Sequence, residues 1–386
     1  MLEEEHVNGK CTTGTVPVVQ GLSPLCSPME ELYPMLFEPN LHETVWGGSK
    51  LTRWKGLAWR DHIGESWEVS AVDSSPCTVA NGSMAGRLLT DVIAANPVQI
   101  LGRQVAGRYG GKMPLLVKFI DARHDLSVQV HPDDAMAMRE HGKFGKTEMW
   151  YVLDAEPGAC LYSGFKTSLS ADEYKKKVSD GTLTDALARH EVHKGDVFYI
   201  PAGRVHAICS GVLLAEVQQS SDVTYRIYDY GRPGLDGKPR ELHTELAAKA
   251  LDYQVQEEYR TEYSQAMGKA NRVIESPFFS VRVTEFDGQF HRNLIKYDSF
   301  VICMCLQGDC RLKVRSTGHE ILLREGYSCL IPAAISDYDI IGRTRVLEAF
   351  IDNMDRSLSG KVMRFLHNRD CPRCARTVPV VHFNPK

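Results

Sequence analysis

The sequence predicts a mainly β protein built from two related β-units with small helical insertions. Segments with a two-residue alternation of side chains, or short apolar runs between turn residues, fill two blocks of the chain, 114–218 and 273–352. The segment GDVFYIPAGRVHAI of the first block corresponds to GYSCLIPAAISDYDI of the second, aligned through Ile200 and Ile331. An internal repeat of this kind implies two units of similar structure.

Composition excludes several classes of function. The chain has 386 residues, enough for two domains, and its formal net charge of -4 argues against nucleic-acid or polybasic membrane binding. No apolar run is long enough to span a membrane, and the start MLEEEH lacks a secretory profile, so we expect a cytoplasmic, soluble protein. The 11 cysteines are scattered through core-like stretches, which favours reduced thiols over a disulfide framework.

The N-terminal third begins without periodicity. We interpret residues 1–31 as a flexible extension, followed by a strand over 65–70, where Glu65 and Trp67 alternate with polar neighbours. An apolar stripe predicts a helix over 87–101 that Pro97 interrupts. The segment GRYGGKM after it has the wrong glycine spacing for a phosphate loop and is assigned to a turn.

Strands then dominate from Pro114 to Leu161. A helical pair is predicted over 168–190, because Ser170 with Glu173 and Thr182 with Asp185 have capping-box spacing. The elements expected next are strands at 196–200 and 212–218, the Gly/Pro-rich loop GRPGLDGKPR, a short helix in ELHTELAAKALD and a linker to about residue 269.

The domain boundaries follow from these elements. We expect a metal-binding catalytic domain over 32–268, a second and metal-free domain over 269–352, and a tail over 353–386. In the aligned repeat, Asp337 replaces His206 and Ile335 replaces Arg204, so the second unit lacks the chemical groups of the first. In the tail, Cys371 and Cys374 have C-x-x-C spacing, but no second ligand pair lies nearby, which favours an incidental pair.

The candidate site centres on LSVQVHPDD. Ser127, Gln129 and His131 share one face of the predicted strand. Taken alone, His131 is an ordinary hydrogen-bonded histidine; with Glu148 in KTEMWYVL and His206 after the Pro201–Gly203 turn it becomes a candidate ligand. Oxygen and imidazole donors in this combination are typical of a catalytic zinc site, although iron and manganese tolerate them as well.

The spacing G-x5-P-x-G-x2-H around His206 resembles a motif of the cupins, which are small jelly rolls that hold a metal inside the barrel. The segments LSVQVHPDD, GKTEMWYVL, IPAGRVHAI and AEVQQSSDVTYRIYDYGR, in this order, resemble the type I mannose-6-phosphate isomerases, particularly their short bacterial form. The resemblance extends over residues 32–352 and implies two cupin-type jelly-roll units, one Zn²⁺ per chain and a sugar phosphate substrate.

The resemblance also implies roles for individual residues. The implied metal ligands are Gln129, His131, Glu148 and His206, the implied essential arginine is Arg226, and the implied phosphate-binding residues are Lys118 and Ser127. Isomerisation through a cis-enediol requires a group that moves a proton, and the alternatives are Lys146, Glu216 and a metal-bound water.

The residues also allow less specific interpretations. Arg226 can face solvent or pair with Asp222 or Asp229. In contrast, Lys118 in LLVKFI and Glu216 in LLAEVQ both lie in apolar strands, where a charge needs a partner, and a shared cavity would supply one. The alternatives for the whole protein are a non-catalytic, metal-containing sugar-binding cupin and an isomerase of another sugar phosphate such as glucose 6-phosphate.

Overall fold

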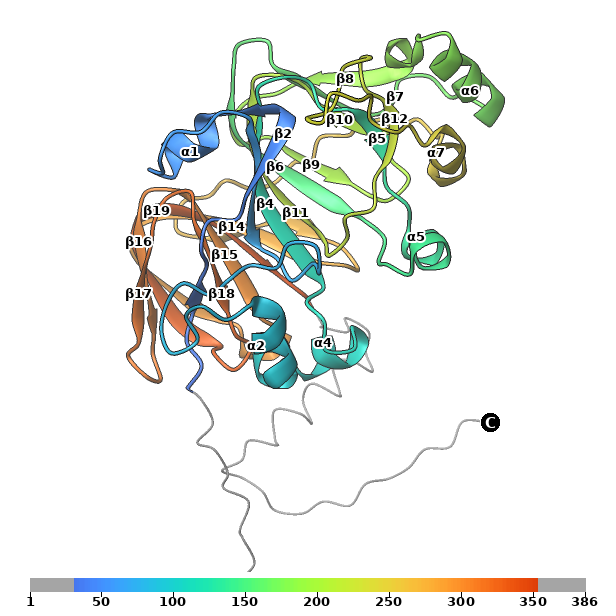
Figure 1. Ribbon diagram of the computed structural model, residues 1–386. Coiled ribbons are helices and arrows are strands. Elements are labelled where there is room, and N and C mark those ends of the chain that lie inside the picture. The colour runs from blue at the N-terminus through green and yellow to red at the C-terminus, as the bar shows by residue number, and fades with distance from the viewer. Residues whose placement is uncertain (1–30, 353–386) are drawn as a thin grey trace, which may run out of the picture. The chain divides into compact units, whose positions relative to one another are not determined.

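The computed structural model describes residues 31–352, which form a mainly β structure of three antiparallel sheets (Figure 1). The predicted fold class is thereby confirmed. The interpretations of residues 1–30 as part of an extension and of the Cys371/Cys374 tail fall outside the described residues. Within 31–352, no helix is long and apolar enough to cross a membrane.

Two sheets of the first unit pack face to face. The six-stranded sheet has the order β2 (Leu41–Gly48), β3 (Ile63–Val69), β4 (Leu115–Ala122), β11 (Val212–Gln219), β6 (Glu148–Ala155) and β9 (Val197–Ile200). The five-stranded sheet has the order β12 (Tyr225–Tyr228), β5 (Val128–Val130), β10 (His206–Ile208), β7 (Cys160–Phe165) and β8 (Leu187–Glu191). Side chains of both sheets, such as Ile120, Trp150 and Ile208, share one core cluster.

The second unit forms the remaining eight-stranded sheet. Its strands are β1 (Met35–Leu36), β18 (Ser328–Ile331), β15 (Val301–Gln307), β19 (Asp337–Phe350), β14 (Ser280–Asn293) and β13 (Ala270–Glu275), with β16 (Cys310–Val314) and β17 (Glu320–Leu323) at one side. The strand β1 comes from the start of the described chain but pairs with β18. The strands β14 and β19 pair along their whole length and are longer than the sequence predicted.

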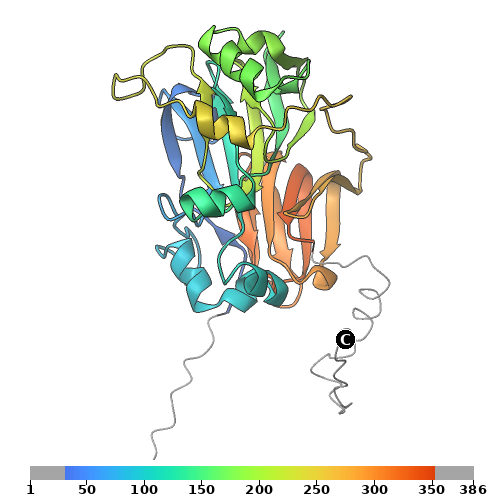
Figure 2. The ribbon, with the colours of Figure 1, turned by 90° about the vertical axis from the view of Figure 1, so that its right-hand side faces the viewer.

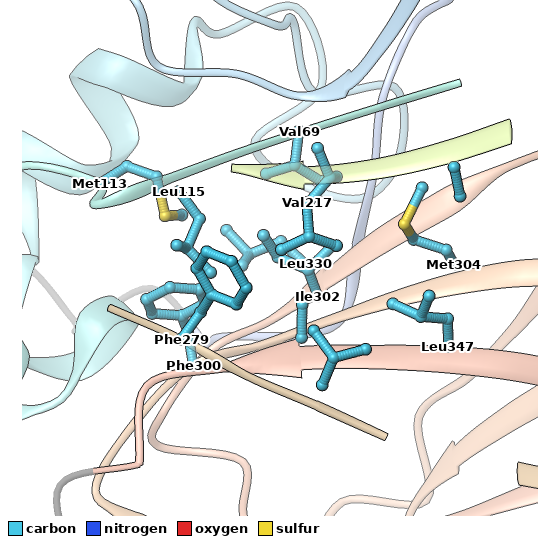
Figure 3. Close-up of a cluster of buried hydrophobic side chains, with 14 of the residues drawn as sticks. Val69, Met113, Leu115, Val217, Phe279, Phe300, Ile302, Met304, Leu330 and Leu347 are labelled. Carbon is cyan, nitrogen blue, oxygen red and sulfur yellow. The ribbon is translucent and has the colours of Figure 1, made fainter. Parts of the chain in front are cut away.

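A large apolar cluster joins the two units. Val69 and Val217 of the six-stranded sheet lie in it together with Ile302 and Leu330 of the second unit, as Figure 3 shows. These side chains are fully buried. The outer face of the six-stranded sheet is therefore covered by the second unit, and its inner face is left for the candidate site.

The aligned repeat has equivalent turns in both units. Three backbone hydrogen bonds recur at matching positions. In the first unit they are Gly195 N to Val152 O, Asp196 N to His193 O and Arg204 N to Pro201 O. Their counterparts in the second unit are Gly326 N to Cys305 O, Tyr327 N to Arg324 O and Ile335 N to Pro332 O. The next strand begins at His206 in one unit and at Asp337 in the other. Equivalent backbones therefore carry different side chains at the position of the candidate ligand.

The helices lie outside the sheets. They are α1 (Lys50–Trp54), α2 (Leu89–Ala95), α3 (Pro97–Leu101), α4 (Arg103–Arg108), α5 (Asp134–His141), α6 (Ala171–Ser179) and α7 (Thr244–Ala250). Residues of α5, α6 and α7 pack with β5, β10 and β12, so these helices cover the outer face of the five-stranded sheet (Figure 2). Pro97 separates α2 from α3, and Ser170 with Glu173 forms the predicted capping box of α6.

Several local predictions were wrong. Residues 183–186 form only a 3₁₀ turn without a side-chain cap from Thr182, and 187–191 form β8 because this segment pairs with the edge of β7. The helix α5 was not predicted, although Asp133 caps its start and Gly142 ends it in the left-handed conformation. Gly107 of the predicted turn lies in α4, and the turn begins after it.

Candidate metal centre and pocket

Three side chains with metal-binding groups meet in the interior of the first unit. His131 follows β5, Glu148 begins β6 and His206 begins β10. The Nε2 atoms of the two histidines are 3.2 Å apart, and Glu148 lies 3.3 Å from His131 Nε2 and 3.4 Å from His206 Nε2. All three side chains are buried.

Backbone carbonyls orient both histidines. His131 Nδ1 is 3.0 Å from the carbonyl oxygen of Val223, and His206 Nδ1 is 2.8 Å from that of Arg204. An imidazole that donates from Nδ1 keeps the lone pair of Nε2 free for a metal. Burial, aided by the Lys146 ammonium, lowers the pKa of His131 to about 3, and burial also lowers the pKa of His206. Both rings are therefore neutral, as metal ligation requires.

Glu148 supplies the negative charge. Burial opposes ionisation, but the Lys146 ammonium holds its pKa well below the usual value. Its Oε1 atom accepts no hydrogen bond from any residue of the described chain. Its Oε2 atom contacts Lys146 Nζ, which also donates to His131 Nε2 at 2.9 Å. Glu148 and His131 thus already contact one cation, the Lys146 ammonium. A carboxylate with two neutral imidazoles also fits a divalent metal.

The fourth predicted ligand lies beside the triad. Gln129 is opposite His206 in the strand register, and its Nε2 atom is 3.3 Å from His206 Nε2. Its Oε1 atom accepts a hydrogen bond of 3.4 Å from Ser127 Oγ. The two ends of an amide exchange places by a half-turn of the terminal group, so Gln129 is positioned to offer an oxygen.

A pocket opens next to these residues. Gln129 and Lys146 are part of its lining, together with Ser127, Lys118, Glu216 and Arg226. The structure thus brings every predicted substrate-binding and catalytic residue to one cavity, beside the candidate metal ligands.

Lys118 and Glu216 neutralise each other across neighbouring strands. They are register partners on β4 and β11, and Lys118 Nζ lies 3.7 Å from Glu216 Oε1 and 3.1 Å from Glu65 Oε2. The expectation that these two buried charges share a cavity is therefore confirmed. Burial and the neighbouring Glu148 raise the pKa of Glu216, whose Oε2 accepts from Trp150 Nε1 at 2.9 Å.

Arg226 enters the pocket from the other side of Gln129. The two residues are register partners on β12 and β5. Arg226 Nη1 donates to the carbonyl oxygen of Glu241 at 3.0 Å, while its buried Nε has no hydrogen-bond partner among residues 31–352. Asp229 binds Arg232 and Arg240 instead, so the simpler interpretation of an Arg226–Asp229 pair is wrong.

Sequence reasoning missed several residues of the pocket lining, among them Trp46 and Arg240. Arg240 lies at the end of the Gly/Pro-rich loop, and Asp229 holds its guanidinium through Nε at 2.7 Å. The available signal was the arginine that ends this loop, but only the folded loop brings it into the pocket.

Comparisons with known proteins agree with the motifs. Residues 35–158 match the family model "Phosphomannose isomerase type I, catalytic domain", and residues 269–351 match "Mannose-6-phosphate isomerase, cupin domain". The chain is 35% identical over 315 residues to the probable mannose-6-phosphate isomerase GmuF of Bacillus subtilis, covering 80% of this chain and 96% of that protein. It is 31% identical to the mannose-6-phosphate isomerase of Streptococcus mutans, covering 81% of this chain and 97% of that protein.

A solved structure is similar as well. The mannose 6-phosphate isomerase from Bacillus subtilis aligns with a TM-score of 0.75 at 32% identity, over 82% of this chain and 99% of that one. Both curated relatives and this structure are matched over nearly their whole length. The similarity therefore includes both units rather than a shared domain alone.

Proposed function

The chain belongs to the type I mannose-6-phosphate isomerase family, and we propose that it interconverts mannose 6-phosphate and fructose 6-phosphate in the pocket beside His131, Glu148 and His206. The observation that carries this proposal is the convergence of two neutral imidazoles and an ionised carboxylate next to a cavity lined by Lys146, Glu216 and Arg226.

The proposed metal is one Zn²⁺ per chain, held by Gln129, His131, Glu148 and His206. Neutral oxygen and nitrogen donors with a single carboxylate suit zinc and leave room for a substrate oxygen. Zinc, when bound, would polarise the substrate oxygens at C1 and C2. The support is the orientation of both rings, whose Nε2 atoms lie within 3.4 Å of Glu148, and the Oε1 of Glu148, which accepts no hydrogen bond from residues 31–352.

The protein's own residues would move the proton and stabilise the charge. We assign Arg226 to the enediolate, because this half-buried arginine has a buried Nε without a hydrogen-bond partner in the described chain, and this Nε can donate to a developing oxyanion. Proton transfer between C1 and C2 falls to Lys146 or Glu216, both of which line the pocket. The raised pKa of Glu216, and an Oε1 atom that accepts no hydrogen bond within the described residues, suit a proton carrier.

The phosphate would be held at the Ser127 end of the pocket. Ser127 offers a hydroxyl and Lys118 a charge. Lys118 already faces Glu65 and Glu216, so the phosphate would share this ammonium with two carboxylates. We place all these groups in a catalytic domain over 32–268 and propose that the domain over 269–352 is metal-free.

The decisive experiment is an assay of the purified full chain on mannose 6-phosphate and on glucose 6-phosphate, with metal removed and then restored as Zn²⁺, Mn²⁺ or Fe²⁺. We expect activity on mannose 6-phosphate that is lost on chelation and returns best with one equivalent of Zn²⁺. Faster turnover of glucose 6-phosphate would reassign the substrate, and full activity in metal-free protein would overturn the proposed centre.

A further inference from the structure

Two cysteines lie opposite each other on neighbouring strands of the five-stranded sheet. Cys160 begins β7, and Cys209 directly follows β10. The register that pairs Ile208 with Leu161 continues to them, and Cys209 N donates to Cys160 O at 3.2 Å. Opposite residues of this hydrogen-bonded kind have Cα atoms about 5.5 Å apart, which lies within the span that a disulfide bridges.

The two thiols differ in their surroundings. The adjacent Cys209 thiol, together with the guanidinium of Arg189, lowers the pKa of Cys160 to about 7. The adjacent Cys160 sulfur and burial raise the pKa of Cys209. Cys160 retains 8% of its surface in contact with solvent. Of the two sulfurs, Cys160 is therefore the one that ionises more readily.

A second pair in the same protein provides a comparison. Cys303 and Cys329 are also register partners, on β15 and β18. Both are completely buried in the core of the second unit, and the pKa of Cys303 is raised by its hydrogen bond with Cys329 and by burial. Opposition on adjacent strands is thus common to both pairs, whereas a residual exposure of 7% to 8% and a neighbouring cation belong to the Cys160 pair.

We propose that Cys160 and Cys209 form a redox site that hydrogen peroxide converts reversibly into an intramolecular disulfide. The Cys160 thiolate attacks one peroxide oxygen; an S–O bond forms, the O–O bond breaks and, after protonation, one water leaves. The sulfur of Cys209 then attacks the sulfenic sulfur of Cys160; the S–S bond forms, and hydroxide departs with the thiol proton as a second water. Two electrons pass from the thiols to the peroxide.

The site adjoins the wall of the substrate pocket. Ile208, immediately before Cys209, lines the pocket together with Leu126, and Leu126 N donates to Ile208 O at 2.8 Å. A disulfide requires closer Cβ atoms than a hydrogen-bonded strand pair provides, so its formation pulls the end of β10 toward β7. A bond strained in this way is readily reduced, and its formation displaces the wall that Ile208 and Leu126 build.

The test treats the reduced full chain with a small excess of hydrogen peroxide, alkylates the remaining thiols and quantifies linked peptides by mass spectrometry. We expect the Cys160–Cys209 link to form first and to disappear with dithiothreitol, while Cys303 and Cys329 stay alkylated. In Cys209→Ser, dimedone should trap a sulfenic acid at Cys160. The variant Cys303→Ser should leave the link unchanged and serves as the matched control.

Two results would overturn the proposal. One is that Cys160 and Cys209 remain thiols when the other cysteines oxidise; the other is that the buried Cys303–Cys329 pair oxidises equally fast. For the link to the pocket, isomerase activity should fall in proportion to the disulfide and recover with reductant, and Cys160→Ser should be insensitive to peroxide. Unchanged activity at full disulfide formation would refute that link but leave the redox site standing.

Discussion

Gln129 on β5 lies directly opposite His206 on β10, with their side-chain Nε2 atoms 3.3 Å apart. On its other side, Gln129 is the register partner of Arg226 on β12. Neighbouring strands are about 4.8 Å apart, so residues from three distant parts of the sequence form one row across the sheet. A substrate held beside Gln129 is within reach of the metal-binding side chains on one side and of a guanidinium on the other.

The metal centre is tested most directly at His206. Replacing it with alanine removes an Nε2 donor that Arg204 O orients, so we expect His206→Ala to bind metal about tenfold more weakly or worse and to lose activity. Metal content after gel filtration, measured by mass spectrometry, reports the stoichiometry. His190→Gln, on β8, is the matched control and should keep one metal per chain. A metal content of one in His206→Ala would remove this residue from the ligand set.

The role of Arg226 is tested by separating kcat from KM. A donor that acts on the enediolate but not on the bound sugar lowers kcat, and the loss of one such donor typically costs about 10²-fold to 10³-fold. We expect Arg226→Ala to show this loss with a KM change of only a few fold. Arg232→Gln, in the loop after β12 and bound to Asp229, should retain most activity. An unchanged kcat in Arg226→Ala would contradict the assignment.

The proton-transferring group is distinguished by pH profiles. Burial and Glu148 raise the pKa of Glu216, and a base must be ionised, so kcat/KM should fall as the pH drops through a value above that of an ordinary glutamate. Glu216→Gln should remove this acidic limb and reduce kcat by about 10²-fold or more. If Lys146→Met abolishes turnover while Glu216→Gln keeps both rate and profile, Lys146 carries the proton instead.

Much of the site was predictable because strand alternation is a local property. Ser127, Gln129 and His131 share a face in any strand, and Lys118 and Glu216 each stood out as a charge within an apolar segment. The strand register then made those two residues neighbours, as the need for a partner predicted.

The parts that were not predicted depend on tertiary contacts. Arg240 reaches the pocket only because Asp229 fixes the loop that carries it. Residues 187–191 have a helical composition but pair with the free edge of β7. The caps of α5, Asp133 and Gly142, are present in the sequence, but the prediction of strands from Pro114 to Leu161 includes this segment.

The phosphate end of the pocket is tested at Ser127. A hydroxyl that donates to a phosphate contributes about 1.5 kcal/mol, so Ser127→Ala should raise KM roughly tenfold and leave kcat nearly unchanged. Inorganic phosphate should inhibit the variant less strongly than the parent protein. Because Ser127 Oγ also donates to Gln129 Oε1, the metal content must be shown to be unchanged. An unaltered KM with full metal would move the phosphate away from this residue.

The interior of the second unit contains an ion pair at the position where the first unit has the pocket residue Glu216. In the first unit, Glu216 on β11 has Trp150 as its register partner; in the second, Glu348 on β19 has Cys303, at the same place in the repeated strand order. Glu348 is fully buried, accepts from Tyr338 OH at 2.7 Å and pairs with Arg292 at 2.8 Å. A carboxylate is thus retained at this position, but a guanidinium neutralises it.

Removing one member of this pair should therefore destabilise the protein without affecting the metal. Because a buried charge without its partner costs about 3–5 kcal/mol, we expect Arg292→Met to lower the free energy of unfolding in urea by an amount of this order. The double variant Arg292→Met/Glu348→Leu removes both charges and should recover most of the loss. Metal content should remain one per chain in both variants. Equal destabilisation in the single and double variants would mean that lost packing, rather than the unpaired carboxylate, sets the cost.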